Sequence, residues 1–169
     1  MGFQTSARGL GGSREALTPS ARRATAPIAI AACAFAIMLA LVVGVGVPDK
    51  LVLRHVVQTL PFWAVIVLGL RRSPATAWIA LPCFLFWLVL MTLIWLFLLG
   101  IARVLTGTFS PLEIAMTIVV GAASVVGIAL FARIKSGLSA WVAASLFILL
   151  AAIQWGCFRM SLLPAIAHR

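Results

Sequence analysis

Long stretches without a single charged residue dominate this chain of 169 residues. Four of them cover residues 28–47, 73–102, 114–132 and 136–158. A helix needs about 20 apolar residues to cross the hydrocarbon core of a bilayer, and each run is close to or beyond that length. Hydrophobic residues make up 64% of the chain and charged residues 9%, far from the composition of soluble domains. The sequence therefore predicts an all-α, polytopic membrane protein.

A fifth apolar segment, residues 51–70, is interrupted by polar groups. Arg54, His55 and Gln58 lie in its first half, and Pro61 follows them. We count it as a span because basic side chains near a helix end can snorkel to the headgroups, and neighbouring helices can satisfy carbonyls that a proline frees. The alternative is an interfacial helix at 49–58, which would leave four spans.

The expected organisation has three parts. Residues 1–26 form a basic, disordered tail, 27–158 the transmembrane domain, and 159–169 a short C-terminal tail. The expected helices are 28–47, 50–70, 75–102, 111–132 and 138–158.

The start of the chain also fits three targeting signals. Met1, Gly2 and Ser6 match an acylation pattern, residues 30–33 resemble a lipoprotein cleavage box, and the Arg and Ser content suits a transit peptide. We favour a plain cytoplasmic tail before an uncleaved first helix.

Basic residues in the connecting segments predict the orientation. With the N-terminus inside, the cytoplasmic segments hold eight: Arg8, Arg14, Arg22, Arg23, Arg71, Arg72, Arg133 and Lys135. The other side holds five: Lys50, Arg54, Arg103, Arg159 and Arg169. This asymmetry favours a cytoplasmic N-terminus in a bacterial inner membrane. Because the basic residues are scattered in small groups at helix ends, we expect lipid rather than nucleic acid as the partner.

Two helices carry small or polar residues at helical spacing. On the first span these are Ala32, Ala36, Ala40 and Gly44, and on the fourth Glu113, Thr117, Gly121 and Ser124. Residues four apart share one face of a helix, and small residues let membrane helices approach closely. Ser110, Pro111 and Glu113 also have the spacing of a capping box, which offers Glu113 a structural role.

With five spans, several polar side chains fall at the same end of the bundle. The candidate cluster is Arg54, His55, Gln58, Arg103, Glu113 and Thr117, on the outer side of the membrane in this topology. We expect Glu113 to pair with Arg54 or Arg103, because ionisable groups at membrane depth need partners and mark functional sites. The competing interpretation is ordinary snorkelling.

The sequence contains no recognisable catalytic or metal-binding set. It has three acidic residues and two histidines, and its cysteines, Cys33, Cys83 and Cys157, lie in separate apolar spans. No paired carboxylates, phosphate loop or zinc spacing is present, so we expect no enzymatic activity and no metal. Trp87 and Trp95, two turns apart, raise the alternative of a groove for a quinone or carotenoid.

Three functions follow as hypotheses. The first is a non-catalytic subunit or accessory protein of an inner-membrane complex, bound to other subunits or to itself through its small-residue faces. The second is a transporter or channel for a small solute or ion, acting as a homo-oligomer. The third is a quinone- or lipid-binding module built from Gln58, His55 and the aromatic residues of the third helix.

Overall fold

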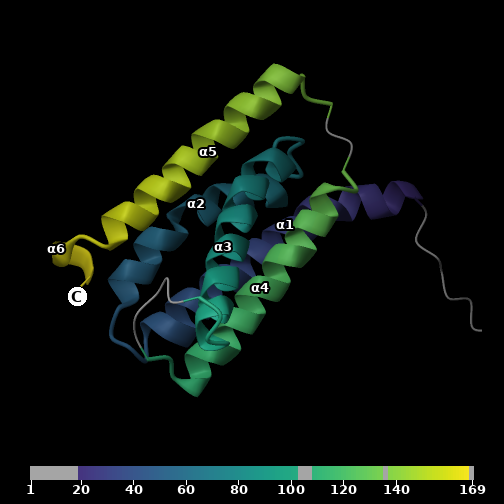
Figure 1. Ribbon diagram of the computed structural model, residues 1–169. Coiled ribbons are helices and arrows are strands. Elements are labelled where there is room, and N and C mark those ends of the chain that lie inside the picture. Colours follow the sequence, from purple (N-terminus) through teal and green to yellow (C-terminus); the bar gives the residue numbers. More distant parts are fainter. Residues whose placement is uncertain (1–18, 103–107, 135–136, 168–169) are drawn as a thin grey trace, which may run out of the picture.

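The computed structural model describes residues 19–102, 108–134 and 137–167 of the chain. In this part every regular element is a helix (Figure 1). The elements are α1 (Pro19–Leu39), η1 (Ala40–Gly46), α2 (Val52–Leu70), α3 (Thr76–Leu98), α4 (Pro111–Phe131), α5 (Ala140–Ser161) and α6 (Pro164–Ala167).

Five helices are long and apolar enough to cross a membrane, namely Thr25–Gly46, Val52–Leu70, Thr76–Leu98, Pro111–Phe131 and Ala140–Ser161. The predicted fold class, an all-α multi-pass membrane protein, is therefore confirmed. The second span is one continuous helix of 19 residues that runs through Pro61, so the interpretation of 49–58 as an interfacial helix is wrong.

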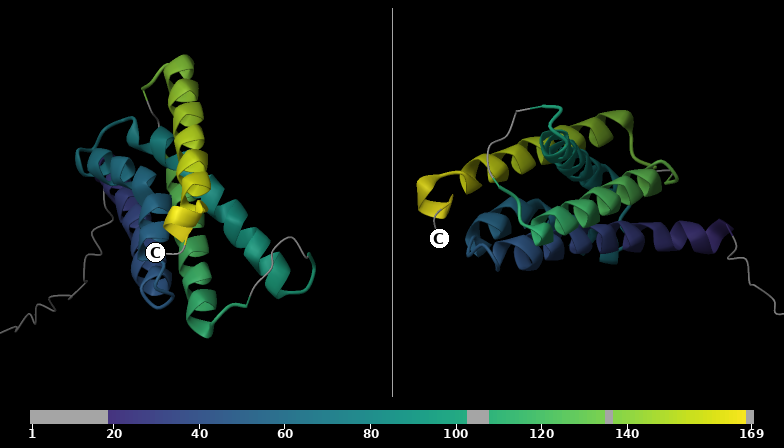
Figure 2. Two further views of the ribbon diagram at one scale, coloured as in Figure 1. Left: turned by 90° about the vertical axis from the view of Figure 1, so that its left-hand side faces the viewer. Right: turned by 60° about the horizontal axis from the view of Figure 1, so that its bottom comes forward.

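Helix α3 is the centre of the bundle, since it packs against α1, α2, α4 and α5. Its Phe84 and Trp87 are fully buried, and Phe84 meets the ring of Phe62 from α2 at 6.0 Å between centroids. Figure 2 shows α1 and α5 on opposite sides of the molecule, with α3 and α4 between them. Large apolar side chains cover the outside, as expected where lipid is the solvent.

Three expected boundaries differ from the structure. Helix α1 begins at Pro19, so residues 19–26 are helical rather than part of a disordered tail; residues 1–18 lie outside the described residues. Proline suits the first turn of a helix, and the Ala and Arg residues after it are good helix formers. Helix α3 ends at Leu98 instead of reaching residue 102, because Gly100 adopts a left-handed conformation that stops it. Helix α5 continues to Ser161, into the predicted C-terminal tail.

The first span changes its winding before it ends. Residues 40–46 form a π-helix, in which each turn holds an extra residue, and the chain then turns into α2. Gly44 lies against Met116 of α4, and a side chain at Gly46 would press on His55 of α2. These two glycines let the π-helix approach both neighbouring helices closely.

The small-residue ladder on the first span is only partly buried. Ala40 is buried and Gly44 contacts Met116, but Ala36 is half-buried and Ala32 is exposed. The buried face of α1 carries Ile30, Ala34 and Ile37 instead. On α4 the stripe lies inward: Thr117 and Ser124 are buried, and Gly121 is half-buried facing Met91 of α3.

Candidate functional site

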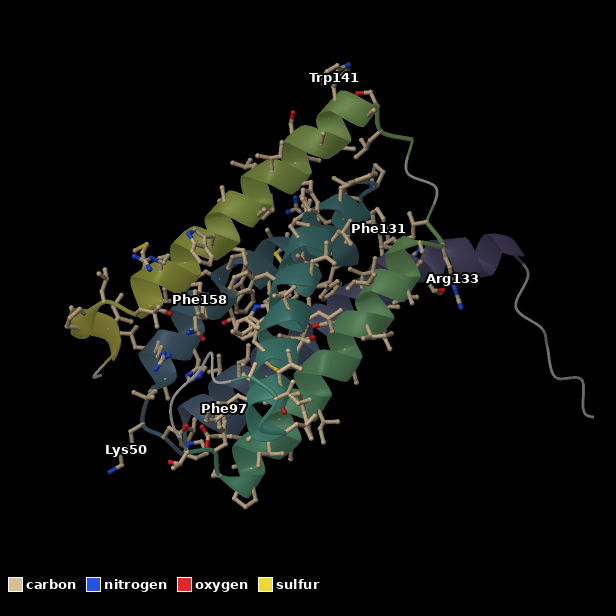
Figure 3. All side chains as sticks on the ribbon, in the orientation of Figure 1. Lys50, Phe97, Phe131, Arg133, Trp141 and Phe158 are labelled. Carbon is tan, nitrogen blue, oxygen red and sulfur yellow. The ribbon has the colours of Figure 1, made fainter. Side chains whose placement is uncertain are left out.

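A cavity of about 300 Å³ opens among η1, α2, α3, α4 and α5. It lies toward the end of the bundle that carries residues 47–51 and Ser110, which we call the Asp49 end. Figure 3 places Lys50 and Phe97 at this end and Trp141 at the other. The polar residues of its wall are Asp49, Arg54, His55, Gln58, Glu113 and Thr117, and the apolar ones Leu41, Val45, Leu51, Trp87, Leu90, Met91, Ile94, Phe109, Met116, Val120 and Phe158.

Five of the six residues of the candidate cluster line this one cavity: Arg54, His55, Gln58, Glu113 and Thr117. The sixth, Arg103, lies outside the described residues. The helix topology explains the convergence, because the start of α2 and the start of α4 lie at the same end of the bundle. Polar side chains early in those two helices must then meet near the same membrane surface.

Glu113 is held by the start of its own helix. Its backbone N–H donates to the Ser110 hydroxyl at 3.2 Å, and its carboxylate accepts the Ser110 backbone N–H at 2.6 Å. The predicted capping box is confirmed. Within the described part of the chain Glu113 forms no ion pair with Arg54, whose Nε is buried without a hydrogen bond. Of the two partners expected for Glu113, Arg54 is therefore not the one, and Arg103 lies outside the described residues.

Asp49 also lines the cavity, although it was not among the candidate residues predicted from the sequence. Partial desolvation raises the pKa of its carboxyl above the ordinary value of 3.8, and repulsion and hydrogen bonding from Glu113 raise it further, while His55 opposes the change. The carboxyl groups of Asp49, in the turn before α2, and Glu113, in the first turn of α4, therefore lie near each other in the cavity wall.

Three further polar side chains of the wall, His55, Gln58 and Thr117, form hydrogen bonds with other protein atoms. His55 Nδ1 lies 2.9 Å from the carbonyl oxygen of Leu51, which can only accept, so this nitrogen carries the proton. Thr117 donates its hydroxyl to the carbonyl of Ile114 at 2.7 Å, and Gln58 donates its amide to the Ser161 hydroxyl at 2.9 Å. All three side chains keep acceptor capacity, and Gln58 also keeps its second amide N–H.

A second buried contact ties α5 to the same region. Gln154, fully buried on α5, donates to the backbone carbonyl of Gln58 at 3.1 Å, close to Pro61. Ser161 in turn donates to the carbonyl of Phe158. Neither Gln154 nor Ser161 was among the residues predicted from the sequence, where Gln154 stands out only as a polar residue inside an apolar run. These bonds hold α5 against the cavity.

Trp87 and Trp95 were the two aromatic residues expected to line a groove, and one of them lies in the cavity wall. Trp87 lines the cavity and is 2% exposed, whereas Trp95 is half-buried and lies outside the wall. Phe158 lies on the α5 side, 5.2 Å from Phe86 between ring centroids. Among the described residues, no group of three or more His, Cys, Asp or Glu could hold a metal ion.

Comparison with known proteins adds no relative: no family model, curated protein or solved structure matches this chain.

Proposed function

We propose that this protein binds a small amphipathic molecule taken from the bilayer. The observation that supports this is the division of the cavity wall, in which polar side chains gather toward the Asp49 end and aromatic and aliphatic side chains form the rest. Mostly apolar cavities with a few convergent polar groups are typical small-molecule sites. Such a wall suits a polar head at the mouth and a chain or ring further inside.

The position of the cavity also favours a ligand from the membrane. Its apolar wall comes from helices that are long enough to cross a bilayer, including Leu90 and Ile94 of α3. The topology with a cytoplasmic N-terminus puts eight basic residues on the cytoplasmic side and five on the other, which favours it. In this topology the Asp49 end faces the outer side of a bacterial inner membrane. The ligand would then come from the outer leaflet.

A cavity-filling variant tests this function. Leu90→Trp places an indole in the wall of the cavity, whereas Val89→Trp, on the next residue, faces outward from a side chain that is 59% exposed. After incubation with a lipid extract of the expression host, native mass spectrometry should find a small molecule retained by the parent and by Val89→Trp. Leu90→Trp should lose it. Equal retention by both variants, or none by the parent, would contradict the proposal.

A second candidate, the non-catalytic subunit of a larger complex, is favoured by α5. This helix packs along one side against α2 and α3 and leaves Trp141, Ile148 and Trp155 at least half exposed. Lipid or a neighbouring helix can cover such a face. Cysteine cross-linking in native membranes from Ile148 would give a discrete larger band if a protein covers α5, and none if lipid does. The homo-oligomeric transporter stays a prediction.

A further inference from the structure

Side chains of both charges lie in the wall of the cavity. Asp49 stands three residues before the start of α2, Arg54 is the third residue of α2, and Glu113 is the third residue of α4. All three are therefore at the Asp49 end, at the level where the spanning helices begin and lipid head groups lie. We call Arg54 the positive pole of the site and the two carboxyl groups its negative pole.

The positive pole has no partner of opposite charge among the described residues. The Nε of Arg54 is buried without a hydrogen bond, and its Nη groups form none within this part of the chain. A guanidinium carries five N–H donors and can bind two phosphate oxygens at once. The wall therefore offers an anion a permanently charged partner with free Nη donors.

The negative pole is also not neutralised by a nearby cation of the described chain. The carboxyl groups of Asp49 and Glu113 lie near each other and repel, and neither pairs with Arg54. Lys50 follows Asp49 in the sequence but is not part of the wall, and it points away from the bundle (Figure 3). A cation that binds between the two carboxyl groups would relieve their repulsion.

The two poles are close enough to belong to one site. His55 is within electrostatic range of Arg54 and also of both carboxyl groups. A head group with one charge would leave one pole without a partner, which is unfavourable at the surface of a membrane-spanning bundle. A head group with both charges satisfies the two poles together.

We propose that the ligand is a zwitterionic lipid, in which a phosphate group carries one alkyl chain and, through a short linker, an ammonium group. The phosphate binds the guanidinium of Arg54, and the ammonium N–H groups donate to Asp49 and Glu113. The alkyl chain lies along Leu90 and Ile94. A single chain fits because the cavity, at about 300 Å³, is at the small end of the range for ligand pockets. This inference rests on the proposed function and adds the class of head group.

Four amphiphiles with the same decyl chain separate the alternatives. They are decylphosphoethanolamine, its N-acetyl derivative, which is an anion, decylammonium, which is a cation, and the uncharged 1-O-decylglycerol. Binding to the purified full-length protein in an uncharged maltoside detergent is measured by isothermal titration calorimetry. Decylphosphoethanolamine should bind about tenfold more tightly than each of the others, because it alone forms charged hydrogen bonds at both poles.

Two variants that each remove one charge test the two poles separately. Asp49→Asn should weaken the binding of decylphosphoethanolamine and of decylammonium about fivefold, without weakening that of the N-acetyl derivative. Arg54→Gln should weaken the binding of decylphosphoethanolamine and of the N-acetyl derivative about tenfold, without weakening that of decylammonium. Such a crossed pattern is not expected from a general loss of structure.

Two controls accompany these variants. Arg71→Gln removes the same charge as Arg54→Gln, but at the opposite end of α2 on an exposed residue, and should bind all four compounds as the parent does. Retained helical circular dichroism shows that each variant is folded. Phosphoethanolamine without a chain should bind far more weakly than the decyl compound. Equal binding would mean that the head group comes from water rather than from a lipid, and would overturn the inference.

The outcomes distinguish this inference from the proposed function. If a compound with one charge or none binds as tightly as decylphosphoethanolamine, and Leu90→Trp blocks that binding, the cavity binds amphiphiles but the zwitterionic head is wrong. Equal effects of Asp49→Asn or of Arg54→Gln on all four compounds also overturn the inference. If none of the four binds, or Leu90→Trp has no effect, both proposals fail.

Discussion

Gln58 and Ser161 lie 103 positions apart in the sequence, yet the Gln58 amide donates to the Ser161 hydroxyl at 2.9 Å inside the bundle. Both side chains are buried, at 4% and 0% exposed. This bond joins the wall of the cavity on α2 to the end of α5.

Ser161→Ala removes the acceptor of this bond and should lower the stability of the protein. Hydrogen bonds between membrane helices contribute on average about 0.6 kcal/mol and at most about 1.7 kcal/mol, so a loss in this range is expected. Thermal unfolding in detergent measures it. Ser145→Ala, on an exposed face of the same helix, is the control and should melt as the parent does. A double-mutant cycle with Gln58→Leu that shows no coupling would contradict the assignment.

Gly127→Ala should destabilise the contact between α4 and α3. A Cβ atom at Gly127 would overlap the ring of Phe84, which is fully buried and cannot move aside. Overpacking of this kind costs about 1–3 kcal/mol. At Gly121 the added Cβ would meet only the Met91 Cβ at 4.0 Å, so Gly121→Ala should be neutral or slightly stabilising. Unfolding in detergent compares the two; equal effects would mean that the helices pack differently.

Ser110→Ala should weaken the start of α4 by about 1 kcal/mol, because it removes the acceptor for the Glu113 N–H. Ser139 caps α5 in the same way but at a longer distance, 3.5 Å from the Val142 N–H. Ser139→Ala should therefore cost less. Hydrogen exchange at the first turn of each helix measures both effects, and a larger loss for Ser139→Ala would argue against the capping box.

Asp49→Asn should make stability less dependent on pH. The folded protein raises the pKa of Asp49, so it holds this proton more tightly than the unfolded chain does. The contribution of Asp49 is then most favourable below its ordinary pKa of 3.8 and is lost as the pH rises through its folded pKa. Near neutral pH, Asp49→Asn removes the repulsion from Glu113 and should raise the melting temperature.

Melting at about pH 4 and about pH 7 checks the sign of this effect. The gain from Asp49→Asn should be larger at the higher pH, and Asp49→Glu, which keeps the charge, should show little gain. A lower melting temperature for Asp49→Asn at neutral pH would contradict the raised pKa.

Hydropathy alone predicted the fold class. Five apolar segments are close to the length that a helix needs to cross a bilayer, and few other structures are possible for them there. The capping box was also readable, since its residues are three apart and act locally. Topology brought Arg54, His55, Gln58, Glu113 and Thr117 to one end, although the sequence did not reveal that a cavity separates them.

Features that depend on distant contacts were not predictable. Gln154 and Ser161 pair with Gln58 across about a hundred positions, and no local pattern signals such a partner. Ala32, on the small-residue ladder of the first span, is exposed in the folded chain, so the ladder is only partly used for packing within the bundle. Glu113 caps its own helix through the backbone N–H of Ser110 and does not pair with Arg54.

The most direct test of the central claim is photocross-linking from inside the cavity. A benzophenone-bearing residue at Leu90, which lines the cavity, is compared with one at Val89, which faces outward, in native membranes. Mass spectrometry identifies the molecules attached at each position. The cavity account predicts one defined small amphiphile at Leu90 and a mixture of bulk phospholipids at Val89. The same phospholipid mixture at both positions would contradict it.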